Sequence, residues 1–178
     1  MNSFAESLAE IQGRCFGKYS LSDDDRALIH NAYWSGNAAE ISAVLEIMCF
    51  DPDDSDMPML LDASSPGSLW IHRCDAAQAM SGLDDGAKIL QIMLERETHT
   101  VVRFYVLREL IDLDDDSVTS LLDCPIPGNG SPIQRSLWIY GNFERESISS
   151  HQAMKFLTKL MDDPKRRHEW LRDHIEHR

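Results

Sequence analysis

The sequence predicts an all-α protein, and three observations lead to that expectation. Apolar residues recur three and four positions apart along most of the 178 residues, which is the period of an amphipathic helix. The two-residue alternation that is typical of strands is almost absent. Residues that favour helix starts and helix ends, such as Ser22 and Gly36, stand between the apolar stripes. We therefore expect helices throughout and no substantial sheet.

The first 67 residues divide into three predicted helices and a loop. An apolar stripe over residues 4–15 predicts the first helix. Ser22 followed by three aspartates predicts the start of the second, because carboxylates are favourable at the positive end of a helix dipole. The third covers residues 38–48. Residues 51–67 contain three prolines and many aspartates, so they predict an acidic loop.

The remainder of the chain predicts a longer series of helices. Ser68 is expected to cap the first of them, and Asp84 and Asp85 to open the second. Thr98 begins the most apolar one, which we expect to be the central buried helix. Ser131 before Pro132 has the pattern of an N-cap followed by proline at the first helical position. The predicted segments are 68–80, 84–95, 98–113, 114–124, a helix from Pro132, 153–161 and 163–175.

Three arginines reveal a weak internal repeat. Apolar residues follow both Arg73 and Arg103 at offsets of three, four, seven and ten positions, and Arg135 matches the first two of these offsets. The arginines are 30 and 32 residues apart. Over residues 68–145 this pattern resembles HEAT-like helical repeats, whose first helix often begins with an apolar residue and an arginine. The period is shorter than the usual ~40–47 residues, and the family's first-helix proline is missing.

The resemblance implies a stack of helix pairs that binds a macromolecule, usually through its concave surface, and it implies no enzymatic activity. It also implies that the aligned arginines bond to neighbouring loop carboxylates or carbonyls and form a structural ladder. An irregular α-helical bundle is the alternative fold. We expect one domain over residues 1–178, with N-terminal helices in 1–50, the acidic loop in 51–67, the repeats in 68–145 and C-terminal helices in 146–178.

The charge distribution is strongly uneven. The net charge is −13, and residues 1–124 carry −15 while residues 125–178 carry +2. Such an acidic surface repels nucleic acid and anionic membranes, so we expect neither as a partner. There is no signal-peptide pattern and no apolar run of membrane-spanning length. The four cysteines form no CxxC pair, which favours a reduced, cytoplasmic protein.

Motifs for metal binding or catalysis are incomplete. Residues 51–62 have aspartates at positions 1, 3 and 12 of a potential calcium loop, but Asp56 stands where the EF-hand requires glycine. His168, His174 and His177 lie close together without the cysteine or aspartate spacing of a zinc site. No nucleophile elbow, phosphate-binding glycine loop or HExxH is present. We therefore expect no metal, no cofactor and no catalytic residues.

Aspartates gather at helix starts in greater numbers than capping requires. If the helix pairs stack in register, these runs fall on one edge and form an acidic strip that attracts a basic protein. The residues we expect to bind that partner are Asp53, Asp54, Asp56, Asp84, Asp85, Asp114, Asp115 and Asp116.

The resulting functional hypothesis is a non-enzymatic protein-binding module. Its narrower form is an immunity-type inhibitor that neutralises a basic toxin such as a nuclease, because a strong negative field accelerates capture of a cationic protein. One alternative is an adaptor or structural subunit of a larger complex, whose interface anchors would include Trp34, Trp70, Trp138 and Trp170. A small enzyme of unassigned type is the third hypothesis.

Overall fold

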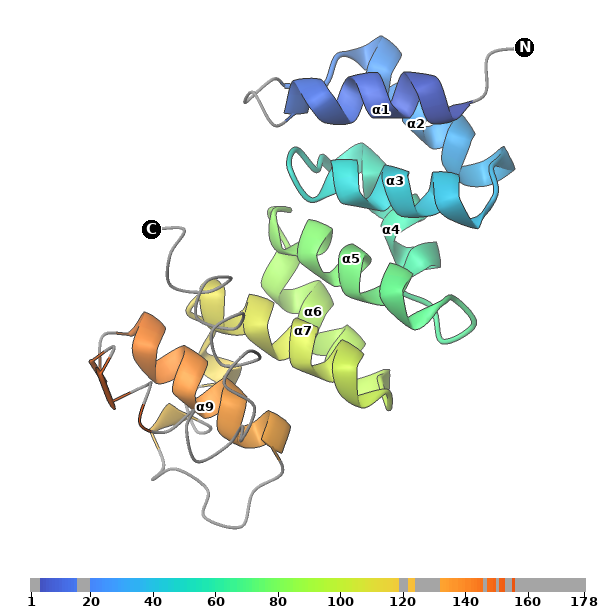
Figure 1. Ribbon diagram of the computed structural model, residues 1–178. Coiled ribbons are helices and arrows are strands. Elements are labelled where there is room, and N and C mark those ends of the chain that lie inside the picture. The colour runs from blue at the N-terminus through green and yellow to red at the C-terminus, as the bar shows by residue number, and fades with distance from the viewer. Residues whose placement is uncertain are drawn as a thin grey trace. The chain divides into compact units, whose positions relative to one another are not determined.

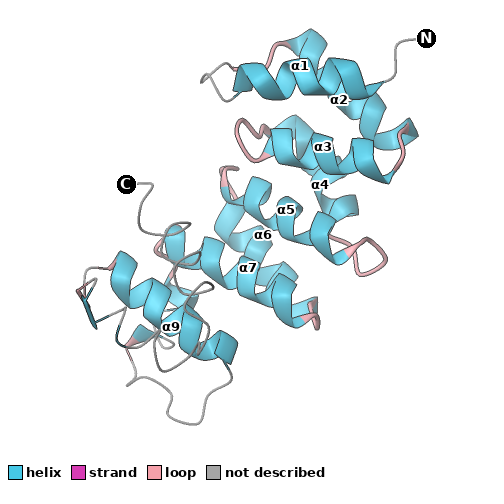
Figure 2. Ribbon diagram, in the orientation of Figure 1, coloured by secondary structure: helices cyan, strands magenta, loops and turns pink. Residues whose placement is uncertain are grey.

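The all-α prediction is confirmed by a computed structural model of the chain, which describes residues 4–15, 20–118, 122–123, 132–145, 147–149, 151–152 and 155. Every regular element of these residues is an α-helix or a 3-10 turn (Figures 1 and 2). The elements are α1 (Phe4–Cys15), α2 (Asp23–Ser35), α3 (Ala38–Met48), η1 (Asp54–Asp56), α4 (Met57–Ala63), α5 (Trp70–Ser81), α6 (Gly86–Arg96), α7 (Thr100–Asp112), η2 (Asp116–Val118) and α9 (Pro132–Glu144).

Close contacts divide the chain into two compact units, Met1–Leu113 and Asp114–Arg178. The expectation of a single domain over the whole chain stays a prediction. The three histidines near the C-terminus and the two helices predicted over 153–161 and 163–175 lie outside the described residues.

The first unit is built in two layers. Helices α1, α3, α5 and α7 lie side by side in one row, each packed against the next (Figure 1). The helices α2, α4 and α6 lie behind this row and pack on its members. The core lies between the layers, and its largest fully buried side chains include Leu45, Met48, Leu60, Met80 and Leu90. Burial of such side chains supplies the main driving force for folding, at about 1.5–3 kcal/mol for each large aliphatic residue.

Capping boxes start two of the helices. Ser22 Oγ accepts from the backbone N–H of Asp25, and the Asp25 carboxylate accepts from the backbone N–H of Ser22. Asn37 and Glu40 form the same reciprocal pair at the start of α3. Each pair satisfies backbone donors that the helix itself leaves unbonded, and one such cap contributes about 1 kcal/mol. The predicted starts of these two helices are therefore confirmed.

The predicted loop over 51–67 is wrong in its central part, because η1 and α4 occupy residues 54–63. Met59, Leu60 and Ala63 are buried, so the segment has an apolar face, but α4 spans only two turns. Pro58 stands in the first turn, where its missing N–H breaks no helical hydrogen bond. The prolines and aspartates of this segment therefore mark the start of a helix.

Two predicted helix starts differ from the structure. Ser68 does not cap α5, since its hydroxyl donates to the carbonyl of Asp62 and the helix begins at Trp70. Asp114 does not open a helix either. Its φ of 51° places it in the left-handed region directly after α7, where aspartate is tolerated better than most residues. The turn that follows is the 3-10 segment Asp116–Val118.

In the second unit, α9 begins at Pro132 as predicted and buries Leu137 and Ile139. Asn142, which interrupts the apolar repeat, is also buried. Its amide donates to the carbonyl oxygens of Leu122 and Trp138 over 3.1 and 3.0 Å. Both of its N–H donors are thus satisfied in the interior, which explains how a polar residue occupies this position.

None of the helices in the described residues is long and apolar enough to cross a membrane.

Candidate functional site

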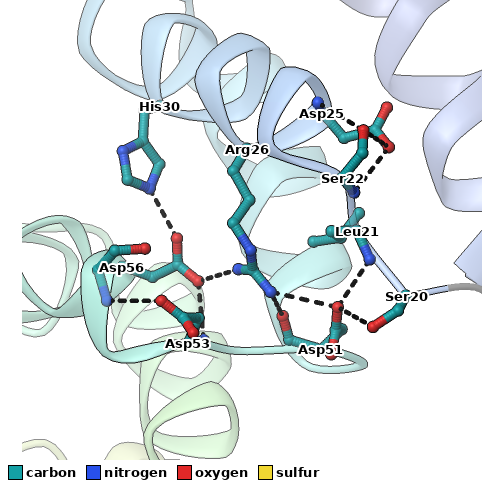
Figure 3. Close-up of polar contacts among 10 residues, drawn as sticks. Ser20, Leu21, Ser22, Asp25, Arg26, His30, Asp51, Asp53 and Asp56 are labelled. Atoms are coloured by element: carbon teal, nitrogen blue, oxygen red, sulfur yellow. Dashed lines mark hydrogen bonds and ion pairs between the residues drawn. The ribbon is translucent and has the colours of Figure 1, made fainter.

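A network of charged side chains joins the start of α2 to the segment that follows α3 (Figure 3). At its centre the Asp56 carboxylate is fully buried. It accepts from Arg26 Nη1 at 2.5 Å and bonds His30 Nε2 at 2.6 Å. It also accepts from the backbone N–H of Asp53 at 2.9 Å, and the Asp53 carboxylate in turn caps η1. A buried carboxylate is stable only with such partners.

The neighbouring Asp51 extends this network towards the start of α2. Its carboxylate accepts from the backbone N–H of Leu21 at 2.8 Å and from the Ser20 hydroxyl at 3.3 Å. Arg26 Nη2 donates to both the carbonyl and the carboxylate of Asp51, at 3.0 and 3.2 Å. Arg26 therefore bonds Asp51 and Asp56 at once, and these bonds fix the segment that follows α3 against α2 (Figure 3).

These contacts involve the aspartates of the potential calcium loop at residues 51–62. The carboxylates of Asp51, Asp53 and Asp56 accept from protein donors, and Asp62, at the twelfth position, accepts from the Tyr33 hydroxyl at 2.7 Å. Residues 54–62 are helical, whereas calcium loops place their ligands around one point in an extended turn. No group of three or more metal-ligating side chains is found among the described residues. Four of the five aspartates of this segment, Asp51, Asp53, Asp56 and Asp62, therefore bond within the protein.

The junction that follows α3 contacts two other junctions, the one that follows α1 and the one that follows α5. Residues 20–21 bond to Asp51, as described above. The next contact is so close that a Cβ atom on Gly82 would lie 2.5 Å from Cγ of Pro52, so glycine is required there. Figure 1 shows the three junctions along the same side of the first unit.

The junctions together expose a group of carboxylates that we call the acidic edge. Its members are the exposed aspartates Asp23, Asp24, Asp53, Asp54, Asp84 and Asp85. Asp85 occupies the N-cap position of α6 without making a side-chain cap bond. Capping therefore does not account for the pair at 84–85, and both carboxylates face solvent.

The predicted partner-binding residues divide into three groups. Asp53, Asp54, Asp84 and Asp85 are exposed members of the acidic edge, and their binding to a partner stays a prediction. Asp56 is wrong as a surface residue, because it is fully buried against Arg26 and His30. The run 114–116 belongs to the second unit, so its place on the same edge stays a prediction.

Sequence reasoning missed Arg26 and His30, which hold the buried aspartate. The available signal was their four-residue spacing, which places both side chains on one face of the helix that follows the first aspartate run. An arginine and a histidine on one face opposite a predicted acidic loop would have suggested a network of polar contacts with its aspartates. The sequence alone does not reveal which aspartate of the loop becomes buried.

The opposite ends of the row helices carry the predicted arginine contacts. Arg73 is buried and its Nη1 donates to both carboxylate oxygens of Glu97, at 3.1 and 2.9 Å. Arg103 Nη1 donates to the carbonyl oxygens of Leu94 and Glu97. Both arginines are the fourth residue of their helix and bond to the end of α6 and the residue after it. The predicted role of these two is confirmed, while the loop before Arg135 lies outside the described residues.

The cysteines in the described residues are structural in character. Cys15 and Cys74 are buried and Cys49 is half-buried. Burial raises the pKa of the Cys49 and Cys74 thiols to about 12, because it disfavours the charged thiolate. A thiol with such a pKa stays protonated at neutral pH and is a poor nucleophile. Cys124 lies outside the described residues.

One half-buried carboxyl, that of Asp75, makes the stability of the first unit depend on pH. Burial, followed by repulsion from Glu46, raises the pKa of Asp75 to about 6. Between about pH 4 and 6 the folded chain keeps a proton that the unfolded chain has released. The stability contribution of this group is therefore greatest below about pH 4 and decreases as the pH rises through 6.

The substitution Asp75→Asn is expected to raise the free energy of unfolding by about 1 kcal/mol at pH 7.5, a value reduced for partial exposure to solvent. At pH 4 it is expected to change stability little, since the native carboxyl is then protonated. Urea unfolding at both pH values measures this difference. Glu46→Gln is the companion variant, and it should show a smaller gain with the same pH dependence. An equal effect of Asp75→Asn at both pH values would contradict the raised pKa.

Comparison of the chain with protein-family models, with curated proteins and with solved structures finds no match. The geometry of the acidic edge is therefore the basis for proposing a function.

Proposed function

We propose that this chain is a non-enzymatic protein-binding module that captures a basic protein on its acidic edge. The observation that carries the proposal is the contact between three successive junctions, which gathers six exposed aspartates on one side of the first unit. The ion-pair network around Arg26 also supports the proposal. Arg26, the cation nearest to these carboxylates in the network, is only 17% exposed and is already paired, so it does not neutralise the surface aspartates.

An acidic edge of this kind acts mainly on the rate of association. Clustered carboxylates attract a cationic partner over about one Debye length, roughly 8–10 Å at physiological salt. Such steering can raise association rates by tenfold or more at low salt. Rapid capture is what an inhibitor of a toxin needs, so the narrower proposal is an immunity-type inhibitor that covers a basic toxin such as a nuclease. We further propose that the paired layers are a short HEAT-like stack and that the protein acts in the cytoplasm.

The proposal predicts that neutralising the edge slows association without unfolding the chain. The variant Asp54→Asn, Asp84→Asn and Asp85→Asn removes three charges at positions that make no cap bond through these side chains. We expect its association rate with a basic partner, recovered by affinity purification, to decrease about tenfold at low salt and much less at high salt. Stopped-flow or surface-based kinetics across a salt series measure the rate.

The matched control removes three exposed carboxylates elsewhere, as Glu6→Gln, Glu10→Gln and Glu95→Gln. It has the same net charge as the edge variant. Equal slowing of the two variants would show that association depends only on net charge, and it would contradict capture of the partner at the acidic edge. Co-expression of the recovered partner with and without this chain tests the narrower proposal. A partner that does not impair growth alone would contradict an inhibitor and leave the binding module intact.

An adaptor role is the second candidate, and the exposure of two tryptophans favours it. Trp34 is 58% exposed and Trp70 is 46% exposed. Trp70 stacks on His99 and is flanked by the exposed Leu69 and Ile71, and exposed aromatic residues of this kind often anchor interfaces. Trp138 is buried and is not an anchor, and Trp170 lies outside the described residues. Loss of partner binding in Trp70→Ala, with normal binding in the edge variant, would favour the adaptor.

A further inference from the structure

A groove lies between α4 and α6, on the layer behind the row. Its volume is about 580 Å³. One wall is the stripe of α6 that contains Lys88, Ile89, Ile92, Met93 and Arg96. The other wall is formed by residues 57, 61 and 64–66, which belong to α4 and the turn after it. Both helices pack on α5, but they do not pack closely on each other.

The groove exists because the two helices differ in length. The helix α4 has seven residues and α6 has eleven, which correspond to about 10 and 16 Å. The shorter helix leaves part of the α6 stripe without a neighbour in its layer. As a result, Leu61 is 50% exposed and Ile92 is 42% exposed on the two walls. A small ligand usually needs a site that buries most of its surface, whereas half-exposed walls suit a segment of a larger molecule.

The charges of the groove are unusual for this unit. Lys88 and Arg96 are exposed and make no bond within the described residues. The other arginines in the described part of the first unit each donate to a carboxylate or a carbonyl. Glu97 also lines the groove, but its carboxylate bonds to Arg73. Asp85 contributes a negative charge only at the end near the acidic edge. Within the described part of this strongly acidic unit, the two uncompensated side-chain cations, Lys88 and Arg96, thus flank one apolar groove.

From these observations we infer that the groove docks an amphipathic helix of a partner protein, with apolar side chains between the walls and acidic side chains facing Lys88 and Arg96. The positions 89, 92, 93 and 96 repeat at helical spacing, as do 57, 61 and 64, so both walls are helix faces that a third helix can pack against. The α6 stripe from 89 to 96 spans about 10 Å, which matches roughly two turns of the bound helix. This site meets the acidic edge at Asp85, and it selects the opposite charge.

The test is a selection from a displayed library of amphipathic helices with randomised polar positions, on the full chain. We expect the enriched peptides to be acidic and to bind Ile92→Gln about tenfold more weakly, which is the effect of losing one apolar contact. The control Ile71→Gln replaces an isoleucine of similar exposure, 40%, outside the groove, and it should bind normally. The double variant Lys88→Glu, Arg96→Glu should bind acidic peptides at least about fivefold more weakly and should select basic ones.

Four results would overturn the inference. Failure to enrich any peptide, or enrichment of peptides that bind Ile92→Gln as well as the native chain, would exclude helix docking in the groove. A third result is that no peptide is enriched but dodecanoate binds to the native chain and not to Ile92→Gln. That result would assign the groove to a small anionic amphiphile. A dimer in sedimentation analysis that dissociates in Ile92→Gln would assign the groove to a second copy of the chain.

Discussion

Replacing Asp56 with alanine is expected to lower the free energy of unfolding by about 3 kcal/mol, because removing one member of a buried charged network leaves its partners without compensation. Arg26 and His30 both bond to this carboxylate, and so does the backbone N–H of Asp53. The side chain of Arg26 is only 17% exposed, so water can replace the lost carboxylate only in part. Urea unfolding monitored by circular dichroism measures the change.

Two further variants separate the network from the general effect of losing an aspartate. Asp54→Ala removes an exposed carboxylate two residues away and should change stability by less than about 0.5 kcal/mol. Asp56→Asn should lie between the two alanine variants, since an amide keeps one oxygen acceptor but turns a donor towards other donors. Equal stability of Asp56→Ala and Asp54→Ala would contradict a structural role for the network.

The second large effect is expected for Glu97→Ala, again about 3 kcal/mol of lost stability. Glu97 accepts both bonds from the buried Arg73 and a further bond from the backbone N–H of His99 at 2.7 Å. Its own side chain is only 4% exposed. The substitution therefore leaves a buried guanidinium unpaired and opens the turn between α6 and α7. Thermal and urea unfolding both measure the loss.

A double-mutant cycle tests whether the loss arises from the ion pair. Arg73→Met combined with Glu97→Ala should recover part of the stability, because the uncompensated charge is removed together with its partner. Glu95→Ala, at an exposed position of α6, is the control and should be nearly neutral. Additive losses from Arg73→Met and Glu97→Ala would show that the two side chains are not coupled.

Much of the helical structure follows from local sequence features. The starts of α2 and α3 depend on side chains that reach backbone groups two or three residues away, so they can be inferred without knowing the fold. The arginines at 73 and 103 also stand where the repeat pattern predicts. The exception is α4, which is too short for its periodicity to be recognised among prolines and aspartates. Its stability comes from packing on α5, and a short sequence pattern does not record such packing.

The candidate surfaces were less accessible to sequence reasoning. The aspartate runs predicted an acidic edge. The contact between successive junctions could not be predicted, because it depends on close packing such as that of Pro52 against Gly82. The same runs could not identify Asp56 as buried. The groove was not predicted, since it depends on the different lengths of two helices that are not adjacent in sequence.

The sequence by itself determined the helical fold class, the positions of most helices and the strongly negative charge. These properties depend on local periodicity, capping and composition, which act between residues a few positions apart. Only the tertiary structure decided the role of each charge. Asp53, Asp54 and Asp56 are neighbours in the chain, yet two are exposed and one is buried by Arg26, 30 residues earlier. Burial and pairing are set by contacts between distant segments, and those contacts exist only once the layers have packed.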